Sequence, residues 1–284
     1  MVLPWELDYR TLPIAFLGGI MAIITISRGS YSRGRQVAEA VAERLGYSCL
    51  ARDVLLEASR EFDVPEIKLV RAIEEAPGFL QTFSHSKERY IALIRAALLK
   101  HAKDDDIVYH GLAGHIFLEG VQHLLKVRII APLEDRLATV VQRDGVDLTA
   151  ARSIIERADR DRRRWSQQLY GIDNEDPSRY DLVLNVARLT VEDATEVICR
   201  TVKLPRFTTT DASAAAVAEL ALSAEVMARI FDIAPLAKVE AKDGRVIISV
   251  REKMLQAAAL QQQLTTRITG IEGLLGSEIR VDFL

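Results

Sequence analysis

The feature that most constrains this chain is residues 22–36, where an apolar run leads into a glycine-containing loop and then an amphipathic segment. Residues 22–27 are apolar on both faces, which predicts a buried parallel strand. Gly29 and Gly34 lie five positions apart in the loop that follows. Glycine lets backbone N–H groups converge on an anion, and the N-terminus of the next helix adds its positive end. Strand, glycine loop and helix in this order predict a phosphate-binding P-loop.

Two residues after the loop differ from the usual P-loop sequence. Arg35 stands where lysine is usual, and Gln36 stands where serine or threonine normally contacts magnesium. An ordinary strand–turn–helix with a glycine cap has the same glycine spacing. The interpretation as a P-loop therefore depends on further signals in the rest of the chain.

Length and composition limit the classes of protein. A chain of 284 residues favours two domains, and 49% hydrophobic residues suffice for a real core. The net charge of −3 gives no sign of a nucleic-acid-binding protein. Cys49 and Cys199 are expected to be reduced, buried thiols in a cytoplasmic protein. His110 and His115 lack a metal-ligand spacing, so no protein metal site is expected.

The N-terminal segment is expected to lie outside the fold. Residues 14–26 carry no charge, but 13 residues are too few to span a bilayer, and the basic region of a signal peptide is missing. Because Met21 directly precedes the first strand, residues 1–20 are interpreted as an N-terminal extension. The alternative is an ordered arm in which Trp5, Phe16 and Leu17 pack on the domain.

Residues 21–203 alternate predicted strands with predicted helices, which indicates an α/β fold. Gly46 is expected to end the first helix, Thr149 to cap a long arginine-rich helix, and Thr190 to open a helix with a capping box. Such alternation favours a P-loop parallel five-stranded sheet with helices on both faces. The predicted strands are 22–27, 48–50, 107–110, 127–131 and 182–185.

A small C-terminal α-β-β-α-β domain is predicted over residues 214–284. Residues 204–213, with one proline and three threonines, are interpreted as a linker. Asp243-Gly244 is a strong hairpin signal between two strands. A helix is expected on either side of this hairpin, and residues 278–283 are expected to close the unit as a strand.

Eight arginines lie between Arg136 and Arg164. Phosphoryl transfer needs cations around the moving group, and the planar guanidinium holds phosphate oxygens bidentately. After the fourth strand of a P-loop fold, this segment is placed to form a mobile lid over the phosphates. The alternative is a solvated helix face, because acidic residues are interspersed.

Several segments together resemble the cytidylate kinase-like family of P-loop kinases over roughly residues 21–203. The similar segments are Ser27-Arg28 through Gly34-Arg35-Gln36-Val37, Leu45-Gly46 through Arg52-Asp53, Ile130-Ala131-Pro132-Leu133-Glu134-Asp135-Arg136, Asp159-x-x-Arg162-x-x-Trp165, Tyr170-Gly171-Ile172-Asp173 and Tyr180-Asp181-Leu182-Val183-Leu184-Asn185.

The resemblance implies a kinase that uses ATP, Mg2+ and a nucleoside monophosphate such as CMP as the phosphoryl acceptor. Arg35, Arg136 and Arg162 would be catalytic, with Arg143 as a further lid cation. Arg52 and Asp53 would bind the acceptor. The residues expected to bind ATP are Gly29, Ser30, Ser32, Gly34, Arg35, Gln36 and, near the adenine, Asn185.

The sequence departs from the family at the phosphates and on the acceptor side. Tyr31 and Arg33 replace glycines, where a Cβ disfavours positive φ and crowds the phosphates. Gln36 replaces a glutamate, and His110-Gly111-Leu112 replaces Gly-Arg-Gly. A nucleotide-binding regulatory protein with little turnover is therefore the alternative function.

The C-terminal unit resembles a BON domain, a small module associated with phospholipid or envelope binding. Its hairpin from Val239 to Val246 and Ile271-Glu272-Gly273-Leu274 carry this likeness. Eight basic and nine acidic residues over 214–284 argue against strong binding to anionic lipid. A protein-contact or homo-oligomerisation module is the alternative.

Overall fold

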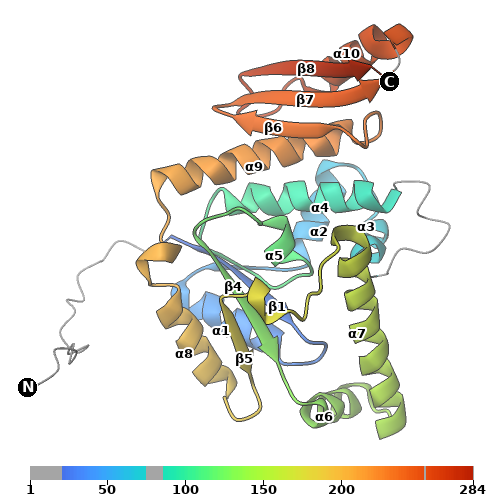
Figure 1. The fold of residues 1–284 in the computed structure, drawn as a ribbon. Helices are drawn as coiled ribbons and strands as arrows, with labels where there is room; N and C mark the ends of the chain where they lie inside the picture. Colours follow the sequence, from blue (N-terminus) through green and yellow to red (C-terminus); the bar gives the residue numbers. More distant parts are fainter. Residues whose placement is uncertain (1–20, 75–85, 253, 284) are drawn as a thin grey trace, which may run out of the picture.

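The computed structural model describes residues 21–74, 86–252 and 254–283 (Figure 1). The predicted N-terminal extension, 1–20, lies outside these residues. The strands of the first sheet are β1 (Ile23–Arg28), β2 (Ser48–Leu50), β3 (Ile107–Tyr109), β4 (Leu124–Ile130) and β5 (Leu182–Asn185). The helices around it are α1 (Gly34–Leu45), α2 (Asp53–Glu61), α3 (Glu66–Glu74), α4 (Ser86–Ala102), α5 (Gly114–Phe117), α6 (Leu133–Asp144), α7 (Leu148–Tyr170) and α8 (Val191–Thr201).

The five strands form one parallel sheet in the order β2-β3-β1-β4-β5, as the alternating pattern predicts. β1 is central, with β3 on one side and β4 on the other. Parallel sheets bind ligands at the carboxyl ends of their strands, where connections depart in opposite directions. The glycine loop after β1 lies at this edge.

Alternation along the strands divides the core between the two faces of the sheet. Ile23 packs in a cluster with α2, α3, α4 and α5, whereas Ile24 and Ile26 pack in a cluster with α1 and α8. The same alternation directs Ser27 and Arg128, paired across β1 and β4, away from the α1–α8 cluster. Two polar groups therefore reach the α3–α7 side of the sheet edge.

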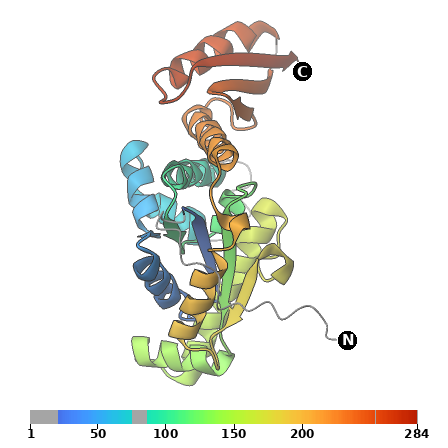
Figure 2. The ribbon, with the colours of Figure 1, turned by 90° about the vertical axis from the view of Figure 1, so that its left-hand side faces the viewer.

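The C-terminal part contains α9 (Asp211–Ile230), β6 (Lys238–Lys242), β7 (Arg245–Glu252), α10 (Met254–Ile268) and β8 (Gly276–Phe283). Its sheet has the order β6-β7-β8, with β7 antiparallel to β6 and parallel to β8. Asp243 and Gly244 both have positive φ in the turn between β6 and β7, which confirms the predicted hairpin. Figure 2 shows this sheet and α10 beyond α9, at one end of the elongated molecule.

Helix α9 belongs to two hydrophobic clusters. Ala221 and Ala224 pack in the large cluster that contains α4, while Val226 and Ile230 pack in the cluster of the three-stranded sheet. Before α9, a 3-10 turn at Pro205–Phe207 places the Phe207 ring in the α1–α8 cluster. The segment interpreted as a linker thus lies against the first sheet. The domain boundaries themselves remain a prediction.

The helix caps confirm two expectations and correct one. Gly46 ends α1 in the left-handed conformation, and Thr190 forms a full capping box with Asp193. The cap of α7 is Asp147, not Thr149, because the Asp147 carboxylate accepts from the Ala150 N–H at 2.8 Å and Leu148 is already helical.

The cysteines and the helix lengths bear on two further expectations. Both cysteines are free thiols; Cys199 is buried, as expected, but Cys49 is only partly so. Within the described ranges, no helix combines the length and apolar character needed to cross a bilayer.

Candidate active site

The loop after β1 is fixed to the end of β4. The Gly29 N–H and the Ser32 hydroxyl both donate to the Ile129 carbonyl, each at 3.0 Å. Ser30 is only 2% exposed, and its hydroxyl has no hydrogen-bond partner within the described structure. A buried, unpartnered hydroxyl is costly unless a ligand bonds to it. The loop therefore offers a polar group that protein contacts leave unsatisfied.

The N-terminus of α1 is open to an anion. Its cap residue, Arg33, makes no side-chain hydrogen bond to the first turn, and that turn contains no acidic residue. The first N–H groups of such a helix lack an intrahelical acceptor and carry the positive end of the dipole. At Gly34, a Cβ would lie 2.7 Å from the Arg28 Cβ, so glycine is needed where the helix passes the strand end.

The two residues that replace family glycines adopt left-handed backbone conformations. Tyr31 has φ of 63° and Arg33 has φ of 60°. Arg33 is exposed, and the Tyr31 ring packs against the apolar cluster of α6 and α7. Neither side chain is among those that line the pocket described next.

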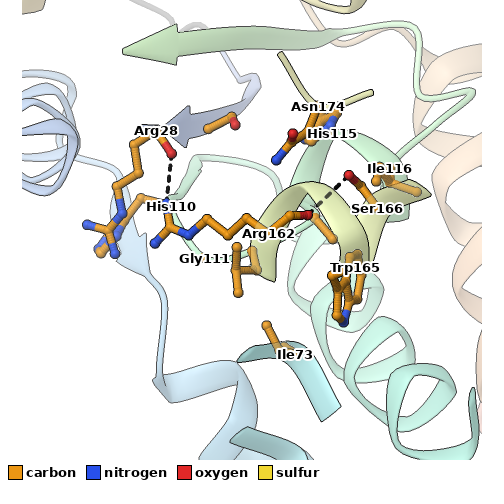
Figure 3. A pocket seen from close by; sticks show the side chains of 13 residues that line it. Arg28, Ile73, His110, Gly111, His115, Ile116, Arg162, Trp165, Ser166 and Asn174 are labelled. Atoms are coloured by element: carbon orange, nitrogen blue, oxygen red, sulfur yellow. Dashed lines mark hydrogen bonds between the residues drawn. The ribbon is translucent and has the colours of Figure 1, made fainter. Parts of the chain in front are cut away.

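Arginine side chains converge on a pocket beside the loop (Figure 3). The Arg162 guanidinium donates to the Arg28 carbonyl at 2.8 Å. Burial, and then the charge of Arg28, lower the pKa of Arg162 to about 10. Burial and the nearby Arg35 also lower the pKa of Arg28. The pocket is narrow, with a volume of about 40 Å³, and no carboxylate is among the lining residues that the structure describes.

A hydrogen-bonded network lies behind two residues that line this pocket, Ser27 and Asn174. The Tyr180 hydroxyl donates to the Asn174 carbonyl at 2.8 Å and lies 3.2 Å from the Ser27 hydroxyl. Arg128 lies over the Tyr180 ring, 5.7 Å from its centroid, and 3.8 Å from Glu175. Sequence reasoning missed Arg128; the available signal was a charge within the buried strand Val127-Arg128-Ile129.

Two histidines of the pocket are neutral at physiological pH. Burial and then Arg28 lower the pKa of His110 to about 4, and burial and then Arg128 do the same for His115. Nδ1 of His110 has no hydrogen-bond partner among the described residues. Where the resemblance leads us to expect an arginine, at His110-Gly111-Leu112, this chain therefore presents uncharged hydrogen-bonding groups.

The lid arginines contact the glycine loop. Arg136 Nε donates to the Ser30 carbonyl at 2.7 Å, and Arg136 Nη2 donates to the Asp159 carboxylate at 2.5 Å. The Arg143 guanidinium lies 4.7 Å from the centroid of the Tyr31 ring. Of the predicted clamp, Arg136 and Arg162 thus reach the loop, while Arg143 contacts a side chain of it.

The remaining predicted site residues lie outside the pocket. Arg35 is exposed and pairs with Glu39 at 2.8 Å, and Gln36 is exposed beside it in the first turn of α1. Arg52 precedes α2 and pairs with Glu66 at 2.6 Å, and Asp53 is exposed at the first position of α2. Asn185 is exposed at the end of β5, opposite Ile130.

A parallel sheet with a phosphate loop after its central strand and an arginine-rich helical hairpin over that loop defines a P-loop kinase-like protein. The sequence pattern of the Cytidylate kinase-like family matches residues 23–188, more than half of the chain. The chain belongs to this family.

Curated relatives share the family at low identity. The cytidylate kinase of Methanothermobacter thermautotrophicus is 27% identical over 172 residues, which is 60% of this chain and 98% of that protein. The cytidylate kinase of Methanopyrus kandleri is 30% identical over 105 residues, which is 34% of this chain and 54% of that protein. Among solved structures, an uncharacterized protein from Eubacterium ventriosum matches with a TM-score of 0.51 and 18% identity, over 64% of this chain and 99% of that one. This structural match supports the fold alone.

Proposed function

We propose that the protein transfers the γ-phosphoryl group of ATP to a nucleoside monophosphate, as the names of its curated relatives suggest for CMP. The observation that carries this proposal is the pocket with Arg28 and Arg162 and no lining carboxylate. Packing two guanidinium groups side by side is unfavourable without an anion. Burial, and then the charge of Arg28, lower the pKa of Arg162, and a bound phosphate would oppose the repulsion between the two arginines.

The chemistry follows from where the cations lie. An oxygen of the acceptor phosphate forms a bond to the γ-phosphorus, and the bond to the β–γ bridging oxygen breaks with its electron pair leaving on ADP. The N–H groups at the start of α1 hold the phosphate oxygens. Arg136 and Arg162 neutralise the charge that gathers on the moving group, because both guanidinium groups already lie at the loop.

Magnesium fits this site as an ion carried by the phosphates. The described residues contain no group of three or more His, Cys, Asp or Glu side chains that could hold a metal. Mg2+ is commonly bound by few protein ligands together with water and substrate phosphates. Oxygen ligands near the phosphates would include the unpartnered Ser30 hydroxyl of the loop and the Gln36 side-chain amide in the first turn of α1. When bound, the ion would neutralise charge on the β- and γ-phosphate oxygens.

The test is turnover with ATP and a panel of nucleoside monophosphates. Arg162→Ala is expected to lower kcat by about 100-fold or more, with a much smaller effect on ATP affinity, because the guanidinium acts on the transition state. Arg157→Ala is the matched control, since Arg157 is on the same helix and its side chain is 82% exposed. Equal losses in both variants would contradict the role of Arg162.

A nucleotide-binding regulator with little turnover is the second candidate. It is favoured by the present partners of the lid arginines, because Arg136 and Arg162 both donate to backbone carbonyls of the loop region. Tight ATP binding without turnover of any monophosphate would favour this candidate over the kinase.

The C-terminal part is proposed to be a BON-like accessory domain that contacts a protein partner, a membrane or a second copy of the chain. Its α-β-β-α-β order supports the likeness. The two free thiols support a cytoplasmic location.

A further inference from the structure

The hairpin of α6 and α7 has a hydrophobic core of its own. Leu137 and Val140 of α6 pack with Ala151 and Ile155 of α7, in a cluster separate from those of the two sheets. Figure 1 shows this end of the hairpin at the lower end of the molecule, while the other end of α7 lies beside α3. The outer half of the hairpin therefore depends on few contacts with the body.

Tyr31 is a residue of the body that packs against this cluster. Its ring packs against the α6–α7 core, and the Arg143 guanidinium lies over its face, 4.7 Å from the centroid. A cation over an aromatic face and an apolar ring in a small core both favour the closed hairpin. The pKa of Arg143 is raised first by Asp144, with which the guanidinium pairs at 2.6 Å, and then by Tyr31.

The backbone at Tyr31 is less favourable than it would be for glycine. Tyr31 has φ of 63°, a conformation that glycine adopts at no steric cost. The ring therefore provides contacts that a glycine could not provide. Next to it, Arg136 Nε donates to the Ser30 carbonyl, so the hairpin meets the loop at adjacent residues.

We propose that Tyr31 is a positioning residue that latches the α6–α7 hairpin onto the phosphate loop. The latch keeps Arg136 and Arg162 at the loop before the phosphates bind. The latch itself is a property of the free protein, whereas its role in positioning catalytic groups rests on the proposed phosphoryl transfer.

Hydrogen–deuterium exchange of the nucleotide-free protein tests the latch without any assay of activity. Tyr31→Gly is expected to speed exchange of α6 and the first half of α7 about tenfold, the change that losing one cation–π contact and its ring packing would produce. Tyr31→Phe keeps the ring and is expected to restore protection. Arg33→Gly is the matched control, because it also places glycine at a positive-φ position of the loop but removes an exposed side chain.

Unchanged exchange in Tyr31→Gly, or an increase no greater than in Arg33→Gly, would overturn the proposal. Should Tyr31→Gly fail to fold, Arg143→Met leaves the loop intact and is expected to change exchange in the same direction by a smaller factor. In the turnover assay, Tyr31→Gly is expected to lower kcat/KM for ATP, with rescue by Tyr31→Phe. A wild-type protein without turnover would remove the proposed function and leave the exchange result standing.

Discussion

The two helical attachments to the first sheet differ in what holds them. Helix α9 joins α4 through buried alanines that are continuous with the largest hydrophobic cluster of the molecule. The outer half of the α6–α7 hairpin has a small separate core and meets the body through Tyr31 and arginine hydrogen bonds. Apolar burial is hard to undo locally, whereas a few polar contacts can be exchanged for a ligand. This difference indicates that α9 is a structural attachment, whereas the outer half of the α6–α7 hairpin can open.

The largest difference between the two attachments is expected from a matched pair of leucine-to-alanine substitutions, one in each. Leu98→Ala in α4 is expected to lower the free energy of global unfolding by about 3–4 kcal/mol, because Leu98 is fully buried in the main cluster. Leu137→Ala in α6 is expected to cost about 1 kcal/mol or less globally, because the hairpin can open while the sheet stays folded. Urea unfolding followed by circular dichroism measures both, and equal losses would show that the hairpin is part of the same cooperative unit.

A second effect is expected from pH, and it arises in the body of the protein and not in the hairpin. The folded state lowers the pKa of His110 and of His115 from 6.5 to about 4. Between these values the unfolded chain binds protons that the folded chain does not, so stability falls as pH drops from about 6.5 towards 4. The loss is on the order of 2 kcal/mol for each histidine.

Unfolding in urea at pH 7 and at pH 5 measures this loss. The double variant His110→Asn, His115→Gln is expected to show a flatter pH dependence than the wild type. A parallel dependence in both proteins would mean that other groups cause it.

The smallest expected effect compares two helix caps. Thr210 caps α9 and Asp147 caps α7, each through a side-chain oxygen that accepts a backbone N–H. Thr210→Ala is expected to lower global stability by about 1 kcal/mol. Asp147→Ala is expected to leave the melting temperature nearly unchanged and to speed amide exchange only in α6 and α7. Calorimetry together with hydrogen exchange separates the two outcomes.

The sheet could be predicted from the sequence because its signals are local. The five strands lie within a few residues of their predicted bounds, and the hairpin at Asp243-Gly244 follows from turn chemistry. Sheet order could not be predicted this way, because it depends on which strands pair across long separations. Asp147 was missed as the cap of α7 because Thr149 also matches the cap pattern.

The site could be predicted only where a residue's position follows from the loop itself. Ser30 and Ser32 are buried in the loop, and their role in phosphate binding stays a prediction, whereas Arg35 pairs with Glu39 at the surface. Arg128 was missed because its role depends on the opposite strand and on Tyr180. The position of the Tyr31 ring could not be predicted because its contacts come from residues more than one hundred positions away.

The sharing of α9 between two cores limits how this chain can be cut or recombined. A fragment that ends before residue 211 would expose to water the face of α4 that the alanines of α9 cover. A fragment that begins after α9 would lack the helix that packs on the three-stranded sheet. A graft of the C-terminal unit onto another enzyme would therefore need a recipient helix shaped like α4. The two parts of the chain therefore share one helix between their hydrophobic cores and are not independent units joined by a linker.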